Sequence, residues 1–242
     1  MKIRTLLIIL LSLPLFSCGG IVHEHSYIDG LCQECGENGF VFYENTLLRY
    51  DGNFENVIIP DSYEINGKKY DVTRISYSAF RDNQTIKSVK ISNNIHSIGY
   101  GVFYNCKNLS TIIIGSNLTN IGDFAFTNCS NLTEFVVDKN NTSFASINGD
   151  LYSNDGKAII QYCIGKTDES LIISNNVVLI EDDAFYNCKN LRSIYIPSSV
   201  ITIGDDAFSY CENLTISCQV ESKPDSWSLY WNTANCPVEW GK

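Results

Sequence analysis

Apolar positions recur along most of this chain in a phrase about 23 residues long. A representative copy is IHSIGYGVFYNCKNLSTIIIGSN, residues 95–117. Ile112 and Ile114 alternate as in a strand, whereas Phe103 and Cys106 are three residues apart, the spacing of one helical or 3₁₀ turn. Each unit is therefore predicted to contain a short strand, a tight turn that carries Phe and Cys, and a longer strand.

The period of the phrase predicts a solenoid. Phe80, Phe103 and Phe126 are each 23 residues apart, and Phe185 and Phe208 are again 23 apart. Because one unit cannot bury its own apolar face, stacked units must share a continuous core in which each unit contacts only its neighbours. The longer strands are expected to pair in parallel and to form a sheet along one face.

One interruption separates the two regular blocks, since the third and fourth of these phenylalanines are 59 residues apart, two periods plus 13. The additional residues fall in the segment 140–167. Within it, LYSNDGKAII indicates a β-hairpin whose turn is Asn154-Asp155-Gly156. A calcium loop at Asp150 and Asp155 is the alternative, but the regular ligand spacing of such loops is missing.

Four of the ten cysteines occupy one position of the phrase: Cys106, Cys129, Cys188 and Cys211. Cysteine is small and readily buried, so it suits a stacked core column. Asn83 takes this position in the first copy, which suits a packing position better than a ladder of disulfides. We expect free, buried thiols, with disulfides between stacked thiols as the alternative.

The repeated phrases resemble a known family. IGDDAFSYCENL, SIYIPSSVITIGDDAF and, upstream, VIIP with EINGKKYDVTRISYSAF closely resemble BspA-like leucine-rich repeats, the 23-residue Treponema pallidum type. The resemblance covers about residues 41–242. It implies a β-rich leucine-rich-repeat solenoid over 41–222, of the α/β class by convention, with a parallel sheet on one face, short helical or 3₁₀ turns and a hairpin insertion at about 140–167. DSWSLYWNTANCPVEWG resembles the terminal segment of such domains, so residues 223–242 are expected to cap the last strand and the core.

The start of the chain has the pattern of a secretion signal. Lys2 and Arg4 precede a short apolar run, and LFSC at 15–18 resembles a bacterial lipobox. The resemblance implies a lipoprotein signal peptide over residues 1–17, cleaved before Cys18, whose thiol is then acylated. A plain signal peptide is the alternative. No other long apolar run exists, so we expect attachment to the membrane by lipid only, at the bacterial cell surface (the outer membrane in a Gram-negative organism).

Residues 18–40 are predicted to form the anchor and a stalk, with a compact set of metal-ligating residue types. His23 and His25 are followed by Cys32 and Cys35 in VHEHSYIDGLCQECGENG. Two imidazoles and two thiolates would complete a tetrahedral, structural zinc site. A Cys32–Cys35 disulfide and a disordered stalk are the alternatives.

Charge and motifs exclude several functions. The formal charge of −10 argues against nucleic-acid binding and suits a soluble monomer. The chain has no Gly-rich phosphate loop and no G-x-S-x-G motif, and no acidic pair can be assigned to one cleft. His96 is replaced by Thr, Val or Ile in other copies. The protein is therefore not predicted to be an enzyme.

What remains is a surface. Alternate residues of each longer strand point outward, and one outward column is expected to contain Lys90, Ile113, Val136, Ile172 and Tyr195, beside a polar column that includes Glu134. Exposed apolar strips with a polar border mark protein contacts. The sequence favours an envelope-anchored module or adhesin that binds a host or bacterial surface protein. A structural spacer and a zinc-dependent enzyme are the alternatives.

Overall fold

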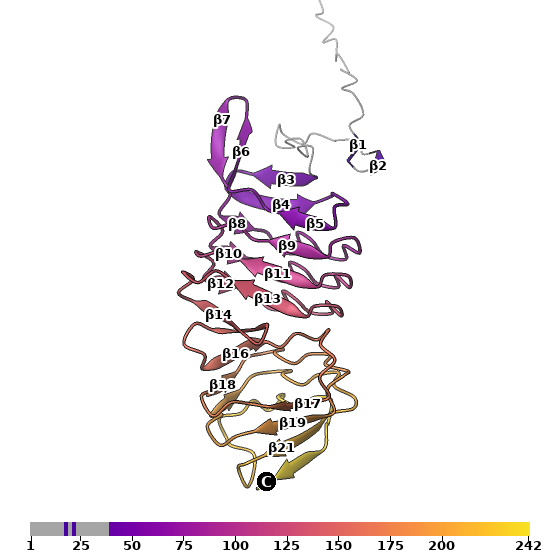
Figure 1. Cartoon of the computed structure of the whole chain (residues 1–242), viewed down its shortest axis with the longest axis vertical. Helices are drawn as coiled ribbons and strands as arrows, with labels where there is room; N and C mark the ends of the chain where they lie inside the picture. The colour runs from indigo at the N-terminus through magenta and orange to yellow at the C-terminus, as the bar shows by residue number, and fades with distance from the viewer. Residues whose placement is uncertain (1–16, 19–20, 23–38) are drawn as a thin grey trace, which may run out of the picture.

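The computed structural model describes residues 17–18, 21–22 and 39–242, and residues 39–242 form one elongated stack of coils (Figure 1). Within the described residues the regular structure consists of strands and turns, with no helix. None of these segments is therefore a helix long and apolar enough to cross a membrane. At the start of the described chain, β1 (Ser17–Cys18) pairs antiparallel with β2 (Ile21–Val22).

The longer strands lie on one face and pair in parallel, but they form two sheets. The first contains β5 (Asn56–Ile58), β9 (Ser88–Lys90), β11 (Thr111–Ile114) and β13 (Glu134–Val137). The second contains β17 (Ser170–Ile172), β19 (Ser193–Ile196), β21 (Thr215–Cys218) and β22 (Val238–Trp240). In the first sheet Ile112 lies opposite Val89 and Phe135, so neighbouring repeats are in register. The predicted parallel sheet is confirmed, and it is interrupted between β13 and β17.

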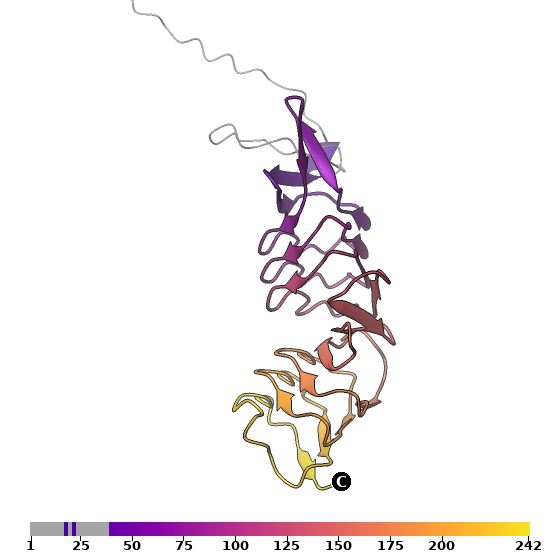
Figure 2. The same cartoon turned by 90° about the vertical axis from the view of Figure 1, so that its left-hand side faces the viewer.

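The shorter strands lie on another face. In the N-terminal part they are β4 (Thr46–Tyr50), β8 (Arg74–Ile75), β10 (Ser97–Ile98) and β12 (Asn120–Ile121). In the C-terminal part they are β16 (Ala158–Gln161), β18 (Leu179–Ile180) and β20 (Thr202–Ile203). At the N-terminal end β3 (Phe40–Tyr43) pairs antiparallel with β4 and covers the first coil. Figure 2 shows the two parts stacked along the long axis.

The tight turns that carry Phe and Cys are not helical. Cys106 N donates to Phe103 O at 3.1 Å, which is a single turn-like bond. Two residues that flank the phenylalanine, Gly101 and Asn105, have φ angles of 56° and 61°. A right-handed helix requires negative φ, so the chain cannot continue the turn into the short helix that was expected.

The insertion contains a hairpin at the predicted place. β15 (Asp150–Ser153) pairs antiparallel with β16, and β14 (Phe144–Ile147) adds a third antiparallel strand. Asp150 accepts from Lys166 Nζ at 2.6 Å, whereas Asp155 accepts from Ser153 Oγ at 2.7 Å. The two carboxylates are therefore used by separate local contacts, and no acidic or His/Cys cluster suited to a metal ion occurs in residues 39–242.

A second hairpin was not predicted. β6 (Ser62–Ile65) and β7 (Lys68–Asp71) project from the N-terminal end of the stack (Figure 1). Asn66 and Gly67 form its turn with φ angles of 49° and 74°. Two successive positive φ angles are typical of the type I′ turn that Asn-Gly favours.

Columns of aromatic rings and thiols fill the core. Phe80, Phe103 and Phe126 stack with centroids 5.0 and 5.9 Å apart. The thiol of Cys106 donates to Phe80 O at 3.0 Å, which stabilises successive turns. All seven cysteines of residues 39–242 are free and buried, as predicted: Cys106, Cys129, Cys163, Cys188, Cys211, Cys218 and Cys236.

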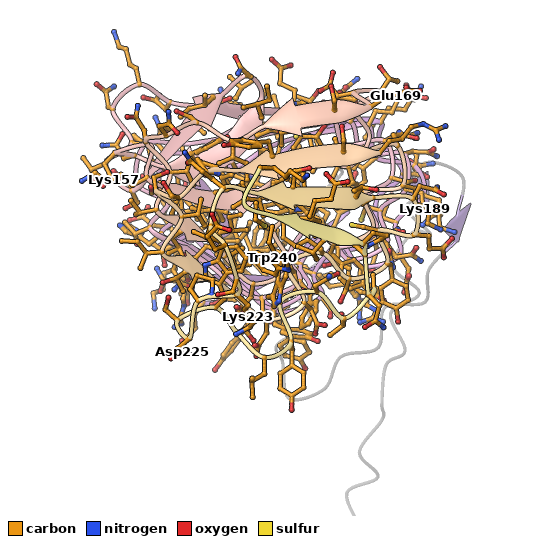
Figure 3. All side chains as sticks on the ribbon, turned by 90° about the horizontal axis from the view of Figure 1, so that it is seen from below. Lys157, Glu169, Lys189, Lys223, Asp225 and Trp240 are labelled. Atoms are coloured by element: carbon orange, nitrogen blue, oxygen red, sulfur yellow. The ribbon has the colours of Figure 1, made fainter. Side chains whose placement is uncertain are left out.

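The C-terminal segment closes the stack. Trp227 and Trp231 are buried, and Trp231 continues the aromatic column with its centroid 5.8 Å from that of Phe208. In the view along the axis, Trp240 lies near the centre of this end while Lys189 and Glu169 lie at its periphery (Figure 3). The buried side chains form two core clusters, whose members meet at the insertion.

Candidate functional site

The predicted outward column lies on the surface of the two long-strand sheets. Lys90, Ile113 and Val136 are direct neighbours in the first sheet, and Ile172 and Tyr195 are neighbours in the second. Val136 and Ile172 are 41% and 78% exposed, whereas Ile113 and Tyr195 are half-buried. Glu134 is exposed beside this column. The structure therefore places all of these side chains outward, but in two groups.

One member of the surface was missed. Ile58 lies opposite Lys90 in the sheet and is 66% exposed. The β6–β7 hairpin lengthens this repeat, so that Ser88 pairs with Asn56, which is 32 residues earlier instead of 23. A search at the fixed period therefore passed over the first repeat. The upstream VIIP segment is the signal that identifies it.

A cleft of about 290 Å³ lies beside the insertion, on the side of the short strands. It is lined by Asp123 and Phe124 from one part of the stack, by Gln161, and by the segment 181–183 (Glu-Asp-Asp) from the other part. The expectation that no acidic pair shares a cleft is therefore wrong. The signal in the sequence was the acidic phrase IEDDAF at the first repeat after the insertion.

A shortened coil creates this cleft. Two residues, Ile160 and Gln161, lie between Ile159 and Tyr162, whereas four residues lie between the equivalent Ile180 and Phe185. This coil therefore has no room for the tight turn of the other repeats. The turn below it faces the resulting space.

A glycine-to-glutamate change follows from the same space. At Gly122 an added Cβ would lie 2.5 Å from Tyr100 N in the preceding turn, so only glycine fits there. Gly204 is similarly close to Asp182. Glu181 occupies the equivalent position below the shortened coil, where it lines the cleft.

Asp183 is the most constrained acid of the cleft. Its side chain is 8% exposed, and its Oδ1 atom has no hydrogen-bond partner. Burial raises the pKa of Asp183 to about 7, and the nearby carboxylates of Asp206, Asp182, Asp123 and Asp205 raise it further. The cleft is therefore a site of concentrated, uncompensated negative charge.

Comparison with known proteins identifies the repeats. A family model described as BspA type leucine rich repeat region matches residues 44–155 and 157–226, in six copies. The chain belongs to the BspA-type leucine-rich repeat family. A search of curated proteins found no match.

Solved structures of related repeat proteins share the fold of this BspA-type chain. The leucine-rich repeat protein of T. pallidum is 22% identical, with a TM-score of 0.52 over 76% of this chain and 81% of its own. A leucine-rich repeat protein of Bacteroides ovatus is 26% identical, with a TM-score of 0.50 over 79% of this chain and 46% of its own. The pneumococcal vaccine antigen PcpA is 15% identical, with a TM-score of 0.50 over 78% and 68% of the two chains.

The predicted N-terminal sites lie apart from the BspA-type repeats. His23, His25, Cys32 and Cys35 are outside the described residues. Cys18 lies in β1, but its side chain is outside the described part of the structure. Zinc binding and lipidation therefore stay predictions.

Proposed function

We propose that this protein is a lipid-anchored cell-envelope module that binds a surface protein of a host or of another bacterium through its long-strand sheets. The aligned exposure of Ile58, Val136 and Ile172 is the observation that supports this proposal most directly. Contiguous apolar side chains on a water-facing sheet are characteristic of protein contacts. Membership in a repeat family that stacks its units into an extended face agrees with this role.

The border of this surface is polar and suits a specific contact. Ser88 donates to Asn56 Oδ1 at 2.7 Å, and Lys87 pairs with Glu55 at 2.8 Å on the same edge of the first sheet. An apolar centre with a polar rim is the general arrangement of protein interfaces. The two groups of the column provide two adjacent contact areas for one partner.

The binding test uses immobilised extracellular-matrix and bacterial surface proteins with the full chain in detergent. In the test variant Val136→Asp is combined with Ile172→Asp. Because both side chains are exposed, the fold is retained. The matched control is Leu229→Asp, which places the same charge on an exposed residue of the cap. We expect capture by the parent and the control and loss of at least tenfold by the double variant; equal capture by all three, or capture by none, favours the spacer.

The anchoring test concerns Cys18. We expect metabolic labelling with an alkyne fatty acid to depend on this cysteine and to disappear in Cys18→Ser, because the thioether requires a thiol. Inhibition of lipoprotein signal peptidase should cause the longer precursor to accumulate. Labelling that persists in Cys18→Ser, or a precursor that is processed normally under inhibition, contradicts the proposed anchor.

A further inference from the structure

Carboxylates gather around the cleft without compensating cations. Asp123, Glu181, Asp182 and Asp183 line it, and no lysine or arginine does. The ion pairs of residues 39–242 involve other acids of the chain. Because like charges in a half-closed space repel one another, this arrangement is unfavourable unless a cation enters.

The stacking of repeats brings further negative charge against the cleft. Asp183 N donates to Asp205 O at 3.0 Å, and Asp205 N donates to Asp182 Oδ1 at 2.7 Å. Asp206, which follows, accepts from Ser209 Oγ at 2.7 Å, so its carboxylate has a partner. Asp183 Oδ1 has none and is the acceptor that remains available to a ligand.

The geometry disfavours a metal ion as this ligand. A calcium site needs six to eight oxygen ligands around one point. No group of three acidic, histidine or cysteine side chains in residues 39–242 converges in this way. A cation whose charge is spread over a larger planar group fits dispersed carboxylates better.

Aromatic side chains beside the acids indicate which organic cation fits. Phe124 lines the cleft, and its ring contacts that of Tyr100 edge to face at 5.4 Å. Tyr77, which is equivalent to Tyr100 in the preceding repeat, is also exposed. Guanidinium groups stack on such rings and also bind carboxylates through paired hydrogen bonds.

We propose that the cleft binds an arginine side chain of a protein partner, with Asp183 as its main acceptor and Phe124 as its stacking surface. The volume of about 290 Å³ suits one long side chain better than a larger molecule. The proposal rests on the proposed function only for the protein nature of the partner. The cleft and the long-strand sheets are separate surfaces, so either site can fail its test while the other passes.

The test uses the full chain in detergent and Nα-acetyl-arginine methylamide as the probe. Binding is followed through the amide NMR signal of Gly122, which lines the cleft. The neutral control is the citrulline analogue, which has nearly the same shape. We expect saturable shifts at millimolar concentration with the arginine probe, at least tenfold weaker binding with citrulline, and tighter binding at pH 8 than at pH 6.

Two variants locate the site. Asp183→Asn retains the positive φ of 57°, which Asn tolerates, and removes one charge. Asp225→Asn removes one charge from an exposed residue of the cap, at the far end of the stack (Figure 3). We expect Asp183→Asn to weaken arginine binding at least tenfold and Asp225→Asn to change it less than twofold. Equal binding of citrulline, an equal effect of both variants, or saturation by CaCl₂ but not by arginine would overturn the proposal.

Discussion

The side-chain amide of Asn187 donates a 3.1 Å hydrogen bond to the side-chain oxygen of Asn128, 59 residues earlier. Both residues follow a core phenylalanine by two positions and have φ angles of 63° and 61°. The two turns therefore contact each other directly, although the insertion lies between them in the sequence. This bond connects the two parts of the stack on the turn side.

Removal of this bond should weaken the coupling between the two parts. Asn187→Gly retains the positive φ and should cost about 1 kcal/mol, the usual value of one hydrogen bond. Urea unfolding followed by tryptophan fluorescence reports only the C-terminal part, because all three tryptophans belong to its core. Far-UV circular dichroism reports both parts, so the two midpoints should move apart.

Asn105→Gly is the matched control for this prediction. Asn105 has a φ of 61° at the same position of its repeat, but its amide donates to Asp82 Oδ1 at 2.6 Å within the N-terminal part. This variant should shift stability without separating the midpoints. Coincident fluorescence and dichroism curves for Asn187→Gly would show that the bond does not couple the parts.

The buried thiols should be unreactive in the folded protein. Burial raises the pKa values of Cys106 and Cys218 to about 12, so thiolate is scarce at pH 8. We expect iodoacetamide to modify the seven described cysteines only after urea is added. Peptide mass spectrometry measures this for each site. Rapid modification of Cys106 without urea would contradict the buried thiol column.

Stability should depend on pH through Asp183. Its folded pKa of about 7 lies above its ordinary value of 3.8, so the folded state holds a proton that the unfolded state has lost between these values. The free energy of unfolding should therefore fall as the pH rises from about 4 to about 7. Asp183→Asn should be more stable than the parent by about 2 kcal/mol at pH 8, and by less at pH 5.5.

Urea titrations at pH 5.5 and pH 8 measure this difference. Asp225→Asn serves again as the charge control, because this side chain is exposed on the cap. A stabilisation by Asp183→Asn that is the same at both pH values would mean that ionisation of this carboxyl is not its cause.

Gly122 and Glu181 should respond oppositely to the same change. Gly122→Ala forces a Cβ to within 2.5 Å of Tyr100 N and should cost about 1–3 kcal/mol. Glu181→Ala, at the equivalent position beside the cleft, should change stability by less than about 0.5 kcal/mol. Thermal unfolding of both variants checks this contrast. Similar losses in both would contradict the shortened coil as the origin of the cleft.

The His/Cys segment should bind one zinc ion per chain if it forms the predicted module. Elemental analysis of the purified chain should detect this ion, and Cys35→Ser should remove it because thiolate is the strongest ligand type there. Chelation should leave the unfolding temperature of the repeats unchanged, since the segment precedes them. A peptide that contains a Cys32–Cys35 disulfide in a zinc-free chain would instead support the alternative.

Repetition explains how much of the fold was predictable. The fixed spacing of Phe80, Phe103 and Phe126 determines the strand register, because equal repeats stack with equivalent residues opposite each other. Inward and outward positions of the long strands follow from the same spacing. The turn conformations do not, because Phe-x-x-Cys spacing is shared by a helix and by a turn that contains positive φ angles.

The cleft was less predictable because it results from an absence. The coil from Ile159 to Tyr162 lacks two residues, and periodicity detects what recurs better than what is missing. Its one positive signal is Glu181 in place of a repeated glycine, which reads as a surface substitution until the preceding turn is known to be short. The β6–β7 hairpin, by contrast, had a usable Asn66-Gly67 signal.

The interruption between β13 and β17 also has a mechanical consequence. Along the long-strand face, interstrand hydrogen bonds connect neighbouring coils everywhere except at this point. When tension acts along the stack, this junction has the least resistance to separation, while each part retains its own core. A load applied to the C-terminal part should therefore extend the protein at the insertion first and leave the N-terminal repeats folded.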